Sequence, residues 1–201
     1  MLTRIAVFVS GGGTNLQALI DAQRDGLIHS GKLELVISDK PDAYALTRAQ
    51  NAGIPTRVVE AKCKDQSEFE AEILRYLNEF GIDMIVLAGF MRILSGDFTS
   101  RYPDRILNVH PSLIPSFCGK GFYGLRVHQA ALDYGVKVTG ATVHFVNEVP
   151  DGGKIIKQKA VDIMPDDTPE SLQKRVMREA EWIILPQACE EVAARISGGE
   201  I

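Results

Sequence analysis

Five short runs of apolar residues, separated by stretches with helical periodicity, constrain the fold of this chain most strongly. The runs lie at residues 5–9, 33–38, 56–59, 83–88 and 106–110. The first and the fourth are apolar almost throughout, which is typical of strands that are covered on both faces. Strands that alternate with helices form a parallel, doubly wound sheet, and such sheets bind ligands beyond the carboxyl ends of their strands. We therefore expect an α/β fold whose site lies at that edge.

The last third of the chain follows another pattern. Residues 138–146 and 155–163 have the composition of two long strands, and the segment between them contains a Pro-Asp-Gly-Gly turn sequence. This pattern predicts an antiparallel hairpin at the edge of the mostly parallel sheet. A long C-terminal helix should begin after Thr168, with Pro169 at its first position and a kink at Pro186. The absence of repeats and linkers indicates one domain over residues 1–201.

Polar residues and proline predict where the other helices begin. Thr14 followed by Gln17, and Asp65 followed by Glu68, have the spacing of capping boxes. The Asp65 box should open a helix that runs to residue 80. Pro41 should begin the helix that runs to residue 50. A short helix capped by Ser95 is expected after the fourth strand.

Composition excludes several classes of partner and compartment. The chain has 201 residues, 45% of them hydrophobic, and a net charge of −4, which gives no basic surface for nucleic acid. No apolar stretch reaches the roughly 18 residues of a membrane span, and the chain enters a strand at once, without a signal peptide. Cys63, Cys118 and Cys189 lack the spacing of metal ligands. We expect a cytoplasmic protein with free thiols, no metal and no membrane contact.

The glycine-rich turn at residues 10–15, Ser-Gly-Gly-Gly-Thr-Asn, joins the first strand to the first helix. Backbone amides in such a turn and the start of the helix favour an anion. The turn lacks the Gly-Lys-Ser/Thr ending of a nucleoside triphosphate loop. It also has Leu16 where a dinucleotide fingerprint has its third glycine, although Asp39 ends the next strand at a suitable distance. A phosphate of a smaller ligand fits best; the alternative is a turn that serves chain geometry alone.

Asn108 and His110 end the fifth strand, which Pro111 then terminates. Residues two apart in a strand share one face, so this amide and this imidazole should lie side by side at the edge where ligands bind. A hydrogen-bond donor beside a side chain that titrates near neutrality suits catalysis. A structural histidine is the alternative, and the position of His110 at a strand end favours a catalytic pair.

Four segments together resemble one family. They are residues 10–18 (SGGGTNLQA), 87–94 (LAGFMRIL), 108–113 (NVHPSL) and 140–146 (GATVHFV), the last leading to Asp151-Gly152-Gly153. In this order they resemble the glycinamide ribonucleotide transformylases, which are phosphoribosylglycinamide formyltransferases of the folate-dependent formyltransferase family. The resemblance implies transfer of the formyl group of 10-formyltetrahydrofolate to the amine of glycinamide ribonucleotide in purine synthesis. It implies small-molecule substrates and leaves a monomer and a weak homodimer both open.

The resemblance also assigns the catalytic roles. Asn108 would donate its amide hydrogen to the tetrahedral oxyanion, and it would also contact the folate. His110, when protonated, would stabilise the same charge and act as a general acid. Asp151 would lie near His110 and relay protons through water. His144 matches a histidine that we expect beside the site and outside the path of the proton.

Ligand-binding residues follow from the same resemblance. In the first half of the chain, residues 1–100, the ribonucleotide phosphate would be held by Gly13, Thr14 and Asn15. Arg178 and Glu181, near the last helix, would complete the ribonucleotide site, with Glu181 on the ribose hydroxyls. The second half, residues 101–201, would supply catalysis and much of the folate site. The folate-binding residues implied are Gln66, Met91, Arg92, Ile93, Leu94, Asn108, Asn147, Glu148, Val149, Pro150 and Asp151.

Three positions differ from the pattern of the family. Gln66 stands where many relatives have an arginine near the folate tail, so recognition of the tail would rest on Lys64 or be weaker. Cys118 replaces a proline in the loop after His110, and Pro150 replaces an aliphatic residue before the key aspartate. Because Cys118 lies in a glycine-rich loop, its thiol should be more accessible than a core thiol, and folate should slow its alkylation; a buried, inert thiol is the alternative.

Other functions remain as alternatives. A formyltetrahydrofolate hydrolase or a methionyl-tRNA formyltransferase would share the core of Asn108, His110 and Asp151. Those enzymes carry a further N-terminal or basic C-terminal domain, for which we expect no room here. A nucleotide-binding module without activity would explain the glycine turn and Asp39 but would leave the catalytic residues without a role.

Overall fold

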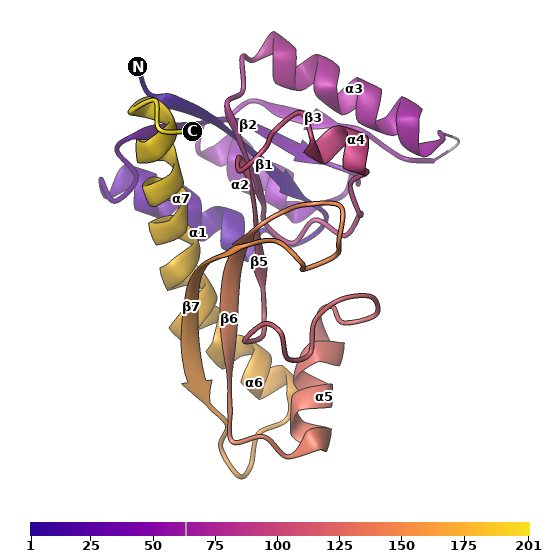
Figure 1. Cartoon of the computed structure of the whole chain (residues 1–201), viewed down its shortest axis with the longest axis vertical. Helices are drawn as coiled ribbons and strands as arrows, with labels where there is room; N and C mark the ends of the chain where they lie inside the picture. The colour runs from indigo at the N-terminus through magenta and orange to yellow at the C-terminus, as the bar shows by residue number, and fades with distance from the viewer. Residues whose placement is uncertain (63) are drawn as a thin grey trace.

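A seven-stranded sheet organises the structure, a computed structural model that describes residues 1–62 and 64–201 (Figure 1). Its strands follow the order β3-β2-β1-β4-β5-β6-β7; β1 to β5 are parallel, whereas β6 is antiparallel to both its neighbours. The predicted doubly wound sheet with an antiparallel C-terminal edge is confirmed. The bounds are Thr3–Val9 (β1), Gly31–Ser38 (β2), Thr56–Val58 (β3), Met84–Leu87 (β4), Ile106–His110 (β5), Val138–Phe145 (β6) and Ile155–Asp162 (β7).

Helices cover both faces of this sheet (Figure 1). Their bounds are Thr14–Arg24 (α1), Tyr44–Asn51 (α2), Gln66–Glu79 (α3), Gly96–Thr99 (α4), Leu125–Tyr134 (α5), Pro169–Val176 (α6) and Trp182–Ser197 (α7), with a π-helical turn, Met177–Glu181 (η1), between the last two. Within the described ranges, no helix is long and apolar enough to cross a membrane. The thiol predicted for Cys63 lies outside the described residues.

The two-residue period of β1 divides the core into two parts. Ile5, Val7 and Val9 pack with α1, α2 and α7 on one face of the sheet. Ala6 and Phe8, which point the other way, pack with α3 and α4. All five side chains are fully buried. A strand that is apolar throughout is therefore the pattern that a central strand between two helical layers requires.

Helix starts test the capping predictions. The capping box of Asp65 and Glu68 is confirmed, and so is the Ser95 cap, whose hydroxyl accepts from the Phe98 amide. The box predicted for Thr14 is wrong, because Gly13 is the N-cap of α1 and provides no side chain. A left-handed φ of 72° at Gly13 turns the chain directly into the helix, so that Thr14 is already its first residue.

One prediction about proline needs correction, and the kink predicted at Pro186 stays a prediction. The second helix begins at Tyr44 and not at Pro41, because residues 41–43 first form a turn and an extended N-cap. The C-terminal helix does begin at Pro169, behind a Thr168 cap. Its irregular part is η1, which ends before Pro186; Pro186 itself lies inside α7. Since proline lacks the N–H that would bond to the carbonyl four residues earlier, it leaves the Trp182 carbonyl next to η1 without its helical partner.

Candidate active site

The site lies where the sheet changes its direction of winding. The chain leaves β1 toward β2 and β3, and it later returns to β4 on the other side of β1. The carboxyl ends of β1 and β4 are therefore neighbours with divergent connections, the arrangement that opens a crevice in doubly wound sheets. The Met91 amide donates to the Ser10 hydroxyl at 2.9 Å, which joins the loop after β4 to the glycine turn after β1.

Asn108 and His110 occupy the same face of β5, as their spacing predicts. The antiparallel pairing of β5 with β6 places His144 opposite Asn108 and Thr142 opposite His110. The Asn108 amide nitrogen lies 3.2 Å from His144 Nε2. His144 Nδ1 lies 2.8 Å from the Phe145 carbonyl, which can only accept, so Nδ1 carries the proton in a neutral ring. In that form Nε2 accepts one Asn108 N–H, and the other Asn108 N–H remains for a ligand. When the ring is protonated, Nε2 instead donates to Asp151, whose oxygen lies 3.5 Å away.

Asp151 reaches the same face from the β6–β7 connection. One carboxylate oxygen lies 3.6 Å from His110 Nδ1 and the other 3.5 Å from His144 Nε2. The Gly119 amide donates to Asp151 at 2.8 Å. Burial by itself raises the pKa of Asp151, but hydrogen bonds from His144 and Gly119 and the charges of both histidines lower it below its ordinary value. The carboxylate is therefore ionised near neutrality.

His144 contributes more to this site than the sequence indicates. We expected it beside the site, and it does lie there, but it also contacts both Asn108 and Asp151. It thus links the amide of β5 to the carboxylate of the hairpin. The signal that could have revealed this contact is the pairing register of β5 and β6, which local sequence patterns do not contain.

The loop after His110 covers the imidazole. The Phe117 carbonyl lies 2.9 Å from His110 Nε2, so this nitrogen carries a proton and donates. The buried Thr142 hydroxyl holds the start of the loop, because it donates to the Ser112 carbonyl at 2.7 Å and accepts from the Ile114 amide at 3.1 Å. Both ring nitrogens of His110 thus face protein groups, and the ring has one fixed orientation.

His128, on α5, is a second buried histidine beside His110. Its ring is 0% exposed, and within the described residues neither ring nitrogen has a hydrogen-bond partner. Burial, together with the charge of His110, lowers its pKa from 6.5 to about 4. The ring is therefore neutral at pH 7.

Acid should destabilise the protein through His128. As pH falls from 6.5 to about 4, the His128 side chain binds a proton in the unfolded chain but remains neutral in the folded protein. The free energy of unfolding should therefore fall by about 3 kcal/mol. Urea denaturation between these pH values measures the fall. His128→Phe, which removes no hydrogen bond, should show that much less acid sensitivity than the parent.

Two features make this comparison specific. Glu181 has a pKa raised to about 6 by burial, so it stabilises the fold as pH falls and opposes His128. Its effect is present in the parent and in the variant and cancels in their difference. The exposed His29, which pairs with Glu190 at 3.2 Å, provides the contrast: His29→Gln should not reduce the acid sensitivity of the parent. Equal slopes for the parent and His128→Phe would contradict the prediction.

The glycine turn meets the π-helical turn η1. The Asn15 amide donates to the buried Glu181 carboxylate at 2.7 Å, across 166 residues of sequence. Burial raises the pKa of Glu181 to about 6, while the Asn15 hydrogen bond works against that rise. The structure thus brings together Asn15 and Glu181. It does not do the same for Arg178, whose side chain is 69% exposed and pairs with its neighbour Glu179.

The loop between β4 and α4 exposes two apolar side chains. Met91 is 52% and Ile93 is 64% exposed, whereas Leu94 is buried in the core. Arg92 lies 3.5 Å from the Asp39 carboxylate and over the Phe69 ring. Asp39 was a candidate for binding the ribose of a dinucleotide, but its carboxylate pairs with Arg92 of the same chain. Exposed apolar side chains beside the carboxyl ends of the strands suit a flat heterocycle.

Gln66 and Glu70 hold this loop from α3. The Gln66 amide nitrogen donates to the Ile93 carbonyl at 3.0 Å and to the Glu70 carboxylate at 2.7 Å. Glu70, which is buried, also accepts from the Ser95 amide at 2.7 Å. Both N–H groups of Gln66 are thus used within the protein, and its amide oxygen is the atom that remains for a ligand.

The connection from β6 to β7 carries Asp151 and approaches the β4–α4 loop. Asn147 accepts from the Val149 amide at 3.0 Å, which closes a local turn, and Val149 and Pro150 are exposed. The Glu148 side chain lies against Gly96 at the end of the β4–α4 loop. Asp151 has a φ of 56°, so the turn places the carboxylate at the cost of local strain. Pro150 does not displace Asp151 from the histidines.

Cys118, in the loop over His110, should react slowly with iodoacetamide. Burial raises the pKa of its thiol, and the charge of Asp151 adds to the rise. It should nevertheless react faster than the buried Cys189, whose pKa is raised to about 12. Folate should slow the reaction of Cys118 further. Mass spectrometry of alkylated peptides measures both rates, and equal rates for the two thiols would contradict the prediction.

In the part of the chain that the structure describes, no three His, Cys, Asp or Glu side chains form a group that could hold a metal ion. The chemistry that the geometry supports uses an amide donor, an imidazole and a carboxylate. These groups can stabilise an oxyanion and move a proton.

The chain matches known proteins both in sequence and in fold. Residues 3–189 match the formyl transferase family model. The phosphoribosylglycinamide formyltransferase of Haemophilus influenzae is 45% identical over 186 residues, which cover 92% of this chain and 84% of that protein. The crystal structure of glycinamide ribonucleotide transformylase 1 from Symbiobacterium toebii superposes with a TM-score of 0.88 at 42% identity, covering 98% of this chain and 89% of that chain.

Longer relatives contain the same region. The trifunctional purine biosynthetic protein adenosine-3 of Homo sapiens is 48% identical over 192 residues, which are 95% of this chain but 18% of that protein. The chain thus spans about a fifth of these trifunctional relatives. Both the sequence match over nearly the whole chain and the shared fold lead to one conclusion: the chain belongs to the phosphoribosylglycinamide formyltransferases of the formyl transferase family.

Proposed function

We propose that this chain transfers the formyl group of 10-formyltetrahydrofolate to the amine of glycinamide ribonucleotide in purine synthesis. The products are formylglycinamide ribonucleotide and tetrahydrofolate. One observation carries the proposal: the amide of Asn108, the imidazole of His110 and the ionised carboxylate of Asp151 converge beside a glycine turn suited to a phosphate. The folate is a co-substrate, and the proposal requires no metal.

The proposed chemistry assigns one step to each group. The ribonucleotide amine attacks the formyl carbon, and a C–N bond forms as the carbonyl oxygen becomes an oxyanion. An Asn108 N–H and the charge of protonated His110 stabilise that oxyanion. The bond from the formyl carbon to the folate nitrogen then breaks. The proton lost by the amine reaches that nitrogen through His110 and Asp151, with water as a carrier.

The ribonucleotide would lie over the glycine turn. Amides of Gly13, Thr14 and Asn15 would bind its phosphate at the start of α1. Glu181 would accept from the ribose hydroxyls, and its hydrogen bond with Asn15 supports a shared site for the two residues. Arg178 would have to leave Glu179 to reach the phosphate.

The folate would lie between two loops. Met91, Arg92, Ile93 and Leu94 would receive the pterin on one side, and Asn147, Glu148, Val149, Pro150 and Asp151 would receive it on the other. The exposed apolar side chains of Met91, Ile93 and Val149 support this placement. Gln66 would meet the folate through its amide oxygen, because its N–H groups serve the loop. The enzyme would act on small molecules in the cytoplasm, as a monomer or a weak homodimer.

An absorbance assay of folate product, with and without glycinamide ribonucleotide, tests the proposal. Product should form only when the ribonucleotide is present. Formate release at an equal rate without it would indicate a hydrolase instead. Titration calorimetry with NAD, the ribonucleotide and a folate analogue adds a second test. Tight binding of NAD without binding of the other two ligands would favour a nucleotide-binding module.

A further inference from the structure

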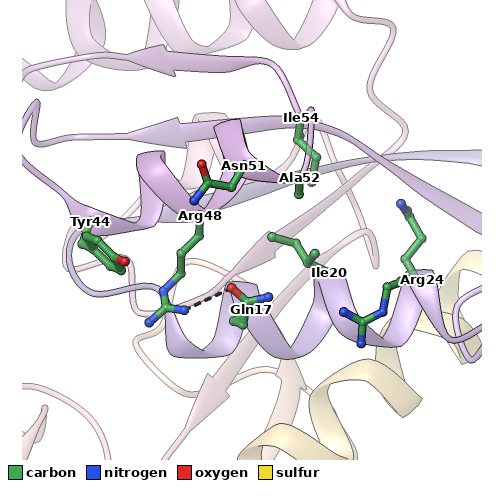
Figure 2. A pocket seen from close by; sticks show the side chains of 9 residues that line it. Gln17, Ile20, Arg24, Tyr44, Arg48, Asn51, Ala52 and Ile54 are labelled. Atoms are coloured by element: carbon green, nitrogen blue, oxygen red, sulfur yellow. Dashed lines mark hydrogen bonds between the residues drawn. The ribbon is translucent and has the colours of Figure 1, made fainter.

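A cavity of ≈ 430 Å³ lies between α1 and α2 (Figure 2). Two arginines line it, and they differ in their partners. Arg24 pairs with Asp21 at 3.0 Å and with Asp25 at 2.9 Å. Among the described residues, Arg48 contacts the Gly12 carbonyl, the Gln17 amide oxygen and the Tyr44 ring, and it forms no ion pair with a carboxylate within 4.0 Å. Figure 2 shows Arg48 reaching from α2 to Gln17 of α1, to which it donates at 3.0 Å.

Arg48 also donates to the glycine turn itself. Its Nε lies 2.8 Å from the Gly12 carbonyl. One turn earlier on α2, the Ala45 amide donates to the Gly11 carbonyl at 3.0 Å. The Gly13 carbonyl accepts from the Gln17 amide at 2.9 Å inside α1. Three successive carbonyls of the turn therefore have fixed directions, two of them set by α2.

The directions of these carbonyls also determine the directions of the backbone N–H groups that would bind a phosphate. In a planar trans peptide the N–H points opposite to the C=O of the same unit. The bond from Ala45 to Gly11 thus directs the Gly12 N–H away from α2, and the bond from Arg48 to Gly12 does the same for the Gly13 N–H. These amides lie at the start of α1, where N–H groups have no partner within the helix.

The charge of Arg48 adds to this geometry. A guanidinium that donates to a carbonyl polarises the whole peptide unit, so the Gly13 N–H becomes a stronger donor. Because no carboxylate neutralises Arg48, its charge also favours an anion at the turn. Gly13 packs closely against α2, since a Cβ at residue 13 would lie 2.6 Å from Ala45 Cβ. The turn therefore cannot move closer to α2.

We propose that Arg48 is a positioning residue for the ribonucleotide phosphate, which it orders and strengthens through the Gly12–Gly13 peptide without touching the phosphate. This inference rests on the proposed function and extends it to a residue on α2. It assigns to the cavity between α1 and α2 the role of housing the guanidinium. The chemical class recognised is a phosphate monoester.

Steady-state kinetics of Arg48→Gln test the inference. The KM for glycinamide ribonucleotide should rise at least about tenfold, as expected for loss of a charged hydrogen bond, while the KM for 10-formyltetrahydrofolate and kcat stay within about twofold. Inorganic phosphate should compete with the ribonucleotide at least about tenfold more weakly than in the parent. Arg48→Lys keeps the charge and should recover part of the loss.

Arg24→Gln is the matched control, because it removes an arginine from the same cavity without touching the turn. It should keep both KM values of the parent. An Arg48→Gln variant with an unchanged KM for the ribonucleotide, or with both KM values raised alike and a lowered Tm, would overturn the inference. A parent protein that forms no product from the ribonucleotide would instead overturn the proposed function. An active parent whose Arg48→Gln variant keeps the parental KM and phosphate competition would overturn this inference alone.

Discussion

Replacing Asp151 by asparagine should lower kcat at least about a hundredfold with little change in stability. The amide keeps the size of the carboxylate and can still accept from the Gly119 amide, now 2.8 Å away. It cannot, however, take up or pass on a proton, and it does not stabilise a charged His110. Positioned acid–base groups contribute about 10²–10⁴ to rate, and this range sets the expected loss. Removal of the imidazole in His110→Ala should cost at least as much.

Single-turnover assays and thermal unfolding measure the two effects separately. Asp133→Asn, an exposed acid on α5, is the matched control and should keep the rate of the parent. Because the pKa of Asp151 lies below its ordinary value, the carboxylate is ionised at every pH near neutrality, so the loss should not vary with pH there. Near-parental rates in Asp151→Asn would mean that the carboxylate has no part in proton transfer.

Gly153→Ala should disable the enzyme by a different route. A Cβ at residue 153 would lie 1.7 Å from the Phe145 carbonyl oxygen. Because this clash is with the backbone, side-chain rearrangement cannot remove it. The strand end and the connection must separate, and Asp151, two residues earlier, must move with the connection. We expect a loss of kcat of about a hundredfold or more, because a displacement of about 1 Å at a catalytic group has effects of that size.

Stability should fall as well. Overpacking of this kind costs about 1–3 kcal/mol, which for a chain of this size corresponds to a Tm lower by roughly 2–12 °C. Gly96→Ala is the control, since a Cβ there meets its nearest atom at an ordinary 3.5 Å. Its Tm should equal that of the parent. Parental kcat in a folded Gly153→Ala variant would show that the hairpin can shift without moving Asp151.

Local patterns were sufficient for most of the fold. Apolar runs mark buried strands because a central strand must hide both of its faces, as β1 does with Val7 on one side and Phe8 on the other. The capping box of Asp65 is equally local, because its two hydrogen bonds join residues three apart. Where a local pattern was wrong, at Thr14, a neighbouring glycine with a left-handed φ had already begun the helix.

Contacts between distant segments were beyond the reach of such patterns. Asn15 and Glu181 meet because α1 and η1 pack on the same face of the sheet. Gln66 keeps its N–H groups for the loop at Ile93, a use that its position in α3 does not reveal. His144 bonds to Asn108 because β5 and β6 pair in one particular register, and a shift of one residue would turn its ring to the opposite face.

The sequence by itself determined the sheet, the glycine turn, the pairing of Asn108 with His110 on one strand face, and the family. Each depends on residues close together in the chain or on motifs with fixed spacing. Only the tertiary structure decided how Asp151 and His144 complete that pair, and which carbonyls of the turn α2 holds. Those contacts depend on strand register and helix packing, which arise from the burial of the whole core and not from any one segment.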